Sequence, residues 1–453
     1  MPDAPVRVAV IGAGHVGLVA AACLAELGHR VIAVDNDPQK LNTLCRGGMP
    51  IYEPGLEDMV KRNVAAGRLS FSGSICDASA ASDIIFIAVG TPPRPDGTAD
   101  LSFLEQVSRE VGTHLGPGSR GPKLVVEKST VPVNTGEQVK RTIQRSAPAG
   151  TSFEVVSNPE FLREGSAVND FFHPDRIVVG VESSYAADEM RRLYAPILEG
   201  PRHPEFMVTD VRSAELIKHA SNSFLALKIS FINAIANICE LTGGNVEHVA
   251  RGMGLDARIG PSFLRAGIGY GGFCFPKDLS AFHRIAKDIG YDFHMLQEVM
   301  NINAQQRHRF MRKVEEALWV VRDKLVGVLG LAFKPQTDDI REAPALDILR
   351  WLEKQGARVK AYDPAAMELV RAEFPGAEYC TSAYQAAEGV DALLVVTEWE
   401  EFAAIDLARL RSVMRHPIVI DSRNVFSPAA MAAAGFEYYS VGRAALRPVA
   451  TKA

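Results

Sequence analysis

A glycine-rich loop directly after an apolar run, near the start of the chain, restricts the possible folds more than any other feature. Residues 8–17 read VAVIGAGHVG, so the pattern G-x-G-x-x-G follows a strand-like run and opens a helix-length segment. A second β-branched run ends in Asp35, at about the 20-residue spacing that accompanies this pattern. Strand, glycine loop, helix, strand and acid in this order predict a βαβ unit of a parallel sheet.

The three glycines of this loop, Gly12, Gly14 and Gly17, predict a dinucleotide site. Gly12 allows a tight turn, Gly14 lets the backbone approach a pyrophosphate, and Gly17 lets helix and strand pack closely. Amide groups at the helix N-terminus then face the phosphate charge. A carboxylate at Asp35 accepts hydrogen bonds from a ribose 2′-hydroxyl and repels a 2′-phosphate. We therefore expect this part of the chain to bind NAD rather than NADP.

Strand-like and helix-length segments alternate over most of the chain, which predicts βαβ units in two Rossmann-like parallel-sheet domains of the α/β class. Helix-length segments separate the first strands at 17–27 and 101–115. The strand-like runs are 6–11, 30–34, 84–89 and 124–126 for the first sheet, and 324–329, 358–362, 392–396 and 417–420 for the second. Gly330 follows a strand of the second sheet, but no third glycine completes a dinucleotide loop, so a second NAD site is not expected.

A segment at 210–241 contains neither proline nor glycine and predicts one helix of about 30 residues. Asp210 or Ser213 would cap its start, and the glycine pair at 243–244 would end it. We expect so long a helix to join two domains and to build an oligomer interface. The predicted domains are 1–205, Rossmann-like and NAD-binding, 206–316, helical and dimer-forming, and 317–453, α/β.

Composition excludes several classes of protein. Hydrophobic residues make up 47% of the 453, as in a globular chain that buries a core. The net charge of −5 lacks the basic excess of nucleic-acid-binding proteins. No uninterrupted run of about 18 apolar residues indicates a membrane span, and the first residues lack a signal-peptide pattern, so we expect a cytoplasmic location. Residues 447–453 show no periodicity.

The six cysteines are scattered without a CxxC pair, so we expect reduced thiols and no metal site. Cys274 differs from the others because it follows the glycine-rich run GIGYGGF. Glycines let the backbone come close to a ligand, and Lys277 or an amide-rich turn would favour the thiolate. The segment alone leaves two interpretations open, a nucleophile or a buried structural thiol.

Polar residues gather in three further places. Lys218 and Asn222 are four residues apart on the long predicted helix and share one face. The sequences EKSTVP at 127–132 and SNPEFLREG at 157–165 each follow a strand, at the sheet edge where α/β proteins bind ligands. Each of these groups is either part of a site or a solvated surface.

Together these segments resemble the UDP-glucose/GDP-mannose dehydrogenase family, from Val6 to about Gly442. So many motifs in the right order are highly specific. Besides the glycine loop, the resemblance rests on GTP at 90–92, EKST at 127–130, NPEFLREG at 158–165, ELIK at 215–218 with Asn222, GGFCFPKD at 271–278, FKP at 333–335, DIRE at 339–342, TEW at 397–399 and DSRN at 421–424.

The resemblance implies an oxidoreductase that oxidises the C6 alcohol of UDP-glucose to the carboxylate of UDP-glucuronate, consuming two NAD and one water. By the resemblance, Cys274 attacks the aldehyde to give a thiohemiacetal, which a second oxidation converts to a thioester. Lys218 and Asn222 would hold the C6 oxygen and stabilise negative charge on it.

The remaining catalytic roles implied by the resemblance concern protons and water. Thr130 and Glu160 would position the base or bound water that takes the hydroxyl proton in the first oxidation. Asp278 and Glu160 would help water to hydrolyse the thioester.

The resemblance also implies the binding contacts and the partners. Arg258 resembles an arginine that reaches into the neighbouring subunit's site, which implies at least a homodimer. The C-terminal domain would bind the UDP end of the sugar nucleotide, and the product would serve polysaccharide biosynthesis. Cofactor contacts fall on Gly12, Gly14, Gly17, Asp35, Lys40, Thr91, Thr130, Glu164, Lys277 and Arg341. Substrate contacts fall on Phe161, Leu162, Glu164, Lys218, Asn222, Arg258, Phe263, Gly271, Phe333, Lys334 and Arg423.

One residue departs from the pattern. Phe273 stands where the UDP-glucose branch usually has serine, and an aromatic ring there either reshapes the sugar pocket or packs the loop. The TEW segment is typical of the UDP-glucose branch, but GDP-mannose or a UDP-N-acetylhexosamine stays an alternative substrate. Two other functions also stay open. A two-electron 3-hydroxyacid-type dehydrogenase would need neither Cys274 nor the residues beyond about 317, and a silent nucleotide-sugar sensor would be expected to lack Cys274.

Overall fold

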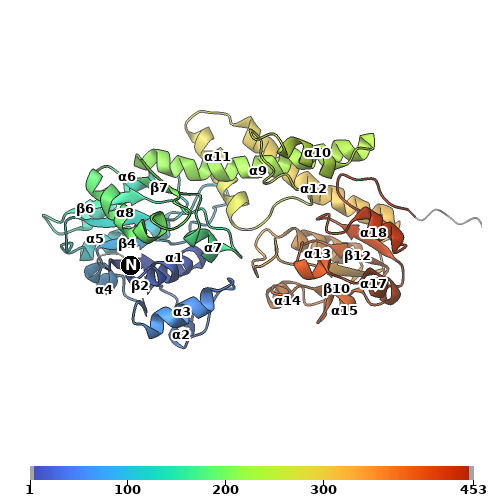
Figure 1. Cartoon of the computed structure of the whole chain (residues 1–453), viewed down its shortest axis with the longest axis horizontal. Helices are drawn as coiled ribbons and strands as arrows, with labels where there is room; N and C mark the ends of the chain where they lie inside the picture. The colour runs from blue at the N-terminus through green and yellow to red at the C-terminus, as the bar shows by residue number, and fades with distance from the viewer. Residues whose placement is uncertain (1–4, 448–453) are drawn as a thin grey trace, which may run out of the picture. The chain divides into compact units, whose positions relative to one another are not determined.

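The computed structural model describes residues 5–447, and the chain divides into two compact units (Figure 1). One unit comprises residues 1–221 and 280–291, and the other comprises 222–279 and 292–453. Residues 1–4 and 448–453 lie outside the described residues. Two expectations fall mostly on these ends of the chain, namely the aperiodic tail at 447–453 and the lack of a signal-peptide pattern in the first residues. The three-domain division expected from the sequence is a finer one and stays a prediction.

A mixed eight-stranded sheet forms the centre of the first unit in the described part of the chain. Its spatial order is β3 (Leu69–Ser72), β2 (Arg30–Val34), β1 (Arg7–Ile11), β4 (Ile84–Ile87), β5 (Lys123–Glu127), β6 (Phe153–Ser157), β7 (Arg176–Gly180) and β8 (Glu205–Thr209). The first six strands follow the order 3-2-1-4-5-6 of doubly wound dinucleotide-binding sheets.

The sheet is parallel, as the sequence predicts, except at one strand pair, because β6 and β7 are antiparallel and meet only at Ser157 and Gly180. The chain between them, residues 158–175, is mostly a loop with one short helix. It lacks the full-length crossover helix that usually returns a chain to a parallel neighbour, and β7 runs in the opposite direction.

The helices of this unit cover both faces of the sheet. They are α1 (His15–Glu26), α2 (Pro38–Cys45), α3 (Leu56–Ala65), α4 (Ile75–Ala81), α5 (Ser102–His114), α6 (Thr135–Ser146), α7 (Ala167–Phe172) and α8 (Ser184–Leu198). Val8 and Val10 of β1 pack with α1, α3, α7 and α8, whereas Ala9 and Ile11 pack with α5 and α6. Because successive residues are buried on opposite faces, the strands are apolar throughout, which is why they were recognisable in the sequence.

The long central helix is confirmed as α9 (Val211–Thr242), the long green helix of Figure 1. The Asp210 side chain accepts a hydrogen bond from the Ser213 amide at 2.9 Å, so Asp210 is the cap. Gly243 follows the last turn with φ of +79°, a left-handed conformation that ends a helix at little cost for glycine. The division between the two compact units falls inside this helix, after Ser221.

By mean hydropathy, α9 is also long and apolar enough to cross a membrane, which the search for an uninterrupted apolar run missed. Its most apolar 18-residue window has a mean hydropathy of 1.5, and 33% of that window is buried. Within the second unit, however, the helix makes polar contacts on its packed side. Ser230 Oγ donates to the Val299 carbonyl at 2.8 Å, and Asn233 Oδ1 accepts from the Gly267 amide at 2.8 Å. A single helix of this kind is weak evidence for a membrane.

The second unit contains the expected smaller parallel sheet. The described strands follow the order β11 (Glu378–Tyr379), β10 (Arg358–Tyr362), β9 (Leu325–Leu329), β12 (Ala392–Val395), β13 (Ile418–Asp421) and β14 (Glu437–Tyr439). The helices are α10 (Val246–Gly254), α12 (His294–Leu318), α13 (Pro344–Gln355), α14 (Met367–Glu373), α15 (Ala383–Ala387), α16 (Glu400–Ala403), α17 (Leu407–Val413) and α18 (Pro428–Ala433). One further helix, α11 (Cys274–Asp288), has its first residues in this unit and the rest in the first.

This sheet again buries both faces. Val326 and Val328 of β9 pack with α12 and α13, whereas Leu393 and Val395 of β12 pack with α15 and α17. Its strand order repeats 3-2-1-4-5-6, so β9 and β12 flank the point where ligands bind in folds of this kind.

Candidate active site

The glycine loop after β1 has the geometry that a pyrophosphate requires. Gly12 has φ of +99°, and a Cβ there would lie 2.6 Å from the Ala88 carbonyl oxygen. A Cβ on Gly17 would lie 1.8 Å from the Gly12 carbonyl oxygen, so α1 packs against the loop too closely for any side chain. A Cβ on Gly14 would meet nothing within 4 Å, so this backbone is open to a ligand. The loop and the N-terminus of α1 therefore fit a dinucleotide.

Asp35 directly follows β2 beside this loop, as the sequence predicts. Its carboxylate accepts hydrogen bonds from the Ala13 amide at 2.8 Å and from Lys40 Nζ at 2.9 Å. Burial opposes ionisation of Asp35, but the hydrogen bonds from Lys40 and from the amides of Asp37 and Ala13 outweigh it and lower the pKa. Asp35 is therefore an anion that Lys40 holds in place, ready to accept from a ribose hydroxyl.

Two predicted threonines meet at the carboxyl ends of β4 and β5. The Thr91 hydroxyl donates to the Thr130 carbonyl at 2.9 Å, and the Ser129 hydroxyl donates to the Val89 carbonyl at 2.7 Å. These bonds join the two loops that follow neighbouring strands, so Thr91 and Thr130 lie at the ligand-binding edge of the sheet.

The first unit also brings Glu160 and Lys218 together as a buried ion pair. Lys218 Nζ donates to Glu160 Oε1 at 3.0 Å, and the side chains are only 5% and 6% exposed. Glu160 Oε2 accepts from the Leu162 amide at 2.7 Å, and Lys218 Nζ lies 5.4 Å from the centre of the Phe161 ring. Because the carboxylate and the ring orient the ammonium group, Lys218 is a positioned cation and not a solvated surface lysine.

A second buried lysine lies near this pair and was missed by the sequence analysis. Lys128 Nζ donates to Asn158 Oδ1 at 3.2 Å, and Tyr194 donates to the same oxygen at 2.8 Å. Burial lowers the pKa of Lys128 to about 8, against the attraction of Glu160. Lys128 and Asn158 stand within the motifs at 127–132 and 157–165, so the motifs were found but not these roles.

Two buried carboxyl groups, those of Glu127 and Glu215, lie close together at the carboxyl end of β5. Glu215 of α9 accepts from the amides of Asn134 and Gly136, each at 2.7 Å. Glu127 ends β5, and burial together with the charge of Glu215 raises the pKa of Glu127 well above its ordinary value. Burial also raises the pKa of Glu215. We infer that Glu127 is protonated and shares its proton with Glu215, which ties β5 and α6 to α9.

The second unit places the predicted nucleophile, Cys274, one helical turn before a carboxylate that two other side chains hold. Cys274 is the first residue of α11 and is partly exposed, and a helix N-terminus favours the thiolate. Asp278, one turn later, accepts from Asn222 Nδ2 at 2.6 Å and from Lys277 Nζ at 2.7 Å. Asp278 is 1% exposed, so its carboxylate is fixed on the helix that begins with Cys274.

The glycine run before Cys274 is tightly packed. A Cβ on Gly271 would lie 2.3 Å from the Glu342 carbonyl oxygen, and one on Gly272 would lie 2.7 Å from the Phe333 ring. The Phe273 ring contacts two predicted cofactor residues. Its ring centre is 4.2 Å from the Arg341 guanidinium and 5.4 Å from Lys277 Nζ. Of the two interpretations of this departure, the structure supports packing of the loop against cations.

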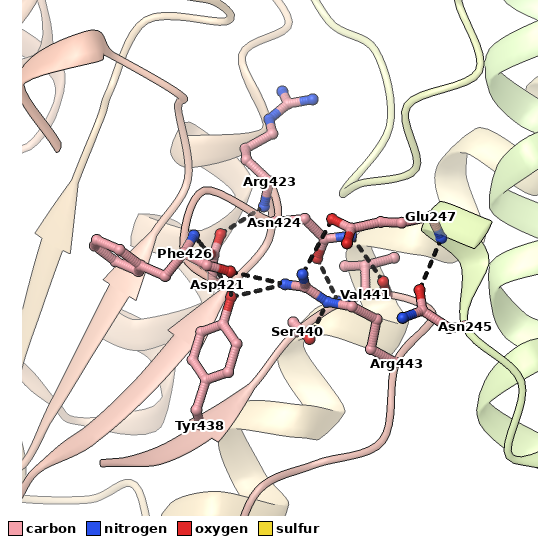
Figure 2. A network of polar contacts seen from close by, with 10 residues as sticks. All are labelled: Asn245, Glu247, Asp421, Arg423, Asn424, Phe426, Tyr438, Ser440, Val441 and Arg443. Atoms are coloured by element: carbon pink, nitrogen blue, oxygen red, sulfur yellow. Dashed lines mark hydrogen bonds and ion pairs between the residues drawn. The ribbon is translucent and has the colours of Figure 1, made fainter. Parts of the chain in front are cut away.

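Arg423 follows β13, at the edge where the second sheet would bind a ligand. Asp421 orients the start of this loop, since its carboxylate accepts from the amides of Arg423 and Phe426 and from the Tyr438 hydroxyl (Figure 2). The Arg423 guanidinium points away from that network and donates to the carbonyls of Val396, Gly269 and Phe333. Arg423 thus joins the loop before Cys274 to the loops after β9 and β12.

Asp363, at the end of β10, occupies the place in the second sheet that Asp35 occupies in the first. Its carboxylate is saturated by hydrogen bonds from the backbone and from one side chain. The donors are the amides of Leu331, Ala332, Ala365 and Ala366 and the Trp399 indole. This carboxylate therefore has no acceptor capacity left for a ribose.

Of the remaining predicted residues, Arg258 is exposed and the others contact neighbouring side chains or are partly buried. Arg258 has a side chain that is 89% exposed and pairs with Asp256 at 2.6 Å, so within one chain it lies on the surface. Phe263 has φ of +64°, and its ring lies 6.4 Å from that of Phe275, which follows Cys274 in α11. The Leu162 side chain packs on the core of the first unit. Glu164 is partly buried, and Lys334 Nζ lies 5.4 Å from the Phe333 ring.

The family models match the chain in three consecutive parts. Residues 6–198 match the UDP-glucose/GDP-mannose dehydrogenase family, NAD binding domain, residues 212–305 match its central domain, and residues 327–428 match its UDP binding domain. The three matches together span most of the chain, in the order that the sequence motifs predict.

Full-length relatives agree with these matches. The UDP-glucose 6-dehydrogenase TuaD of Bacillus subtilis is 47% identical over 442 residues, which cover 97% of this chain and 94% of the relative. The UDP-glucose 6-dehydrogenase of Rhizobium meliloti is 46% identical, with 96% and 99% covered. The structure of a UDP-glucose dehydrogenase from Pyrobaculum islandicum matches with a TM-score of 0.89 at 40% identity, with 98% and 99% covered. The chain therefore belongs to the UDP-glucose/GDP-mannose dehydrogenase family.

Proposed function

We propose that the protein oxidises UDP-glucose to UDP-glucuronate in two NAD-dependent steps. The observation that carries this proposal is the placement of Cys274 at the start of α11, one turn before an Asp278 that Asn222 and Lys277 hold. A two-electron alcohol dehydrogenase has no use for such a thiol. The names of the curated relatives support UDP-glucose as the substrate.

In the first oxidation, the buried Lys218 ammonium stabilises negative charge on the C6 oxygen as its proton leaves. Glu160 fixes the ammonium, and Thr130, at the ligand-binding edge of the same unit, positions the water that accepts the proton. The glycine loop and Asp35 hold NAD, which when bound accepts one hydride in each oxidation.

In the second stage, the Cys274 Sγ attacks the C6 aldehyde and forms a C–S bond, and the aldehyde oxygen takes up a proton. Loss of a second hydride and of that proton turns this thiohemiacetal into a thioester. Water then adds to the thioester carbon, the C–S bond breaks, and the thiol and the carboxylate are released. Asp278 and Glu160 assist this water, one of whose protons goes to the departing sulfur while the other is released. The covalent bond keeps the aldehyde from escaping.

Assembly and location extend the proposal. Exposed apolar side chains recur every seventh residue along α9, at Phe224, Phe231 and Ile238, with exposed fractions of 61%, 46% and 54%. A stripe of this kind is typical of a helix that packs on a partner. We propose that it forms a homodimer and that Arg258 completes the partner's site, in a cytoplasmic enzyme that serves polysaccharide biosynthesis.

Replacement of the nucleophile tests the covalent mechanism. Cys274→Ser retains the shape of the loop but removes the thiolate, so we expect the rate of UDP-glucuronate formation to fall on the order of 10³-fold or more. Mass spectrometry of the product mixture measures it. Cys45→Ser, at an exposed cysteine, is the matched control and should keep the full rate. Wild-type rates for Cys274→Ser would exclude the thioester route.

A further inference from the structure

The buried carboxylate of Glu53 joins the dinucleotide loop after β1 to the loop after β6. Glu53 lies in the connection between α2 and α3, and its side chain is 0% exposed. Its Oε2 lies 2.8 Å from His15 Nε2, and the same oxygen accepts from the Gly165 amide at 2.7 Å. Its Oε1 accepts from the Ala167 amide at 2.8 Å.

The first of these partners belongs to the dinucleotide loop. His15 is the first residue of α1 and stands inside the G-x-G-x-x-G pattern, directly after Gly14, whose open backbone faces the ligand. A side chain that holds His15 therefore holds the N-terminus of α1, which carries the amides that face a pyrophosphate.

The other two partners belong to the loop after β6. Gly165 follows Glu164, which the family resemblance assigns to both cofactor and substrate, and Ala167 begins α7. A carboxylate on these amides stabilises the helix start and sets the direction of the chain leaving Glu164. Glu53 thus holds together two loops that are distant in the sequence, since one contains His15 and the other contains Gly165.

Because the Glu53 carboxylate is buried, loss of any one of its partners would cost free energy. A carboxylate removed from water needs partners for its lone pairs, and Glu53 accepts hydrogen bonds from the amides of Gly165 and Ala167 and lies within ion-pair distance of His15 Nε2. If either loop moved away, the buried charge would lose part of that compensation. The two loops are therefore expected to move together.

We propose that Glu53 is a positioning residue that couples the cofactor loop to the substrate loop. This inference rests on the proposed function for the identity of the sugar nucleotide, but not for the dinucleotide site. The Glu53 side chain is 0% exposed, which is why we assign it a positioning role. It acts through His15 on NAD affinity and through Gly165 on the placement of Glu164.

The test is Glu53→Gln, which keeps the shape and one acceptor oxygen but removes the charge. A hydrogen bond to a charged group is strong enough that its loss should weaken the binding that it supports about tenfold. We expect the Kd for NADH, measured by fluorescence titration, and the KM for UDP-glucose both to rise about tenfold. Glu57→Gln, on the exposed side of α3, is the matched control and should change neither.

A double-mutant cycle separates coupling from general damage. His15→Asn should raise the Kd for NADH and leave the KM for UDP-glucose unchanged. In the His15→Asn background, Glu53→Gln should add little to the loss of NADH affinity and still raise the KM for UDP-glucose. Additive NADH losses, or a lowered unfolding temperature with wild-type Kd and KM, would overturn the proposal.

The NADH titration also separates this inference from the proposed function. If the wild-type protein bound NADH but did not oxidise UDP-glucose, the substrate assignment would fail. The effects of Glu53→Gln and His15→Asn on NADH affinity would still decide whether Glu53 positions the cofactor loop.

Discussion

At the scale of single residues, the contacts of Phe273 explain why an aromatic ring can replace the serine that is usual at this position. Its ring lies within cation–π distance of both Arg341 and Lys277, and both cations are predicted to contact NAD. Lys277 also donates a hydrogen bond to Asp278, which lies one turn after Cys274. The Phe273 ring is therefore close to a lysine that holds this carboxylate.

We expect Phe273→Ser to raise the KM for NAD about tenfold and to leave the KM for UDP-glucose nearly unchanged. The reason is that each cation–π contact contributes roughly 0.5–2 kcal/mol, and the substitution removes both. Initial-rate kinetics measure the two constants, and Phe273→Tyr is the control because it keeps an aromatic face. A variant whose KM rises for UDP-glucose alone would instead place Phe273 in the sugar pocket.

At the scale of elements, the carboxyl pair of Glu127 and Glu215 joins β5 and the start of α6 to the base of α9. The pair lies next to Lys128 in the sequence and one turn before Lys218 on the helix. Arg212 is the charged group that favours ionisation of Glu215. A shared proton in this place makes the junction sensitive to alkaline pH.

We expect the thermal stability of the wild-type protein to fall as pH rises from 5 to 9. The native pKa of Glu127 is raised above the unfolded value of about 4.3. The stabilisation is therefore complete below that unfolded pKa and is lost as pH rises through the native pKa. Glu127→Gln has no proton to lose and can still donate to Glu215, so its unfolding temperature should fall less over this range.

The control for this comparison is Glu105→Gln on α5, where the carboxylate is exposed. It should follow the wild-type curve, as measured by differential scanning calorimetry at each pH. Parallel curves for wild type and Glu127→Gln would show that the pair carries no shared proton.

Elements with strong local patterns were predictable, and those defined by distant partners were not. The predicted ends of β1, β4 and α9 agree with the structure to within two residues, because apolar runs and caps are local signals. The antiparallel direction of β7 escaped prediction because strand pairing depends on the path of the chain between strands. The edge strand β8 carries the apolar residues Phe206, Met207 and Val208 but is largely exposed, so its run is shorter than that of a strand buried on both faces.

The candidate site divides in the same way. Gly12, Cys274 and Lys218 stand in motifs that the sequence displays, and the structure gives each a suitable environment. Glu53 stands in no motif that the sequence analysis recognised, because its partners lie far away in the chain. A buried charge is recognised only when the groups that compensate it are known.

At the scale of the whole molecule, the exposed apolar stripe on α9 predicts the state of assembly. Phe231→Glu would place a carboxylate in the proposed dimer interface, at a cost of several kcal/mol if it were buried unpaired. We expect this variant to sediment with the mass of one chain and to lose activity, since Arg258 would no longer reach a partner. Analytical ultracentrifugation measures the mass.

Leu369→Glu provides the matched control, because Leu369 is an exposed leucine on α14 away from the stripe. It should sediment as the wild type does. A wild-type protein with the mass of one chain at micromolar concentration would contradict the assembly proposed for α9.

The yield of NADH from a limiting amount of sugar nucleotide tests the central claim most directly. With excess NAD, the absorbance at completion should correspond to two NADH for each UDP-glucose, with GDP-mannose and UDP-N-acetylmannosamine compared in parallel. Two NADH from UDP-glucose, and little from the others, is the result that four-electron oxidation through Cys274 predicts. One NADH per UDP-glucose would indicate a two-electron dehydrogenase, and none would indicate a protein that binds the nucleotide sugar without oxidising it.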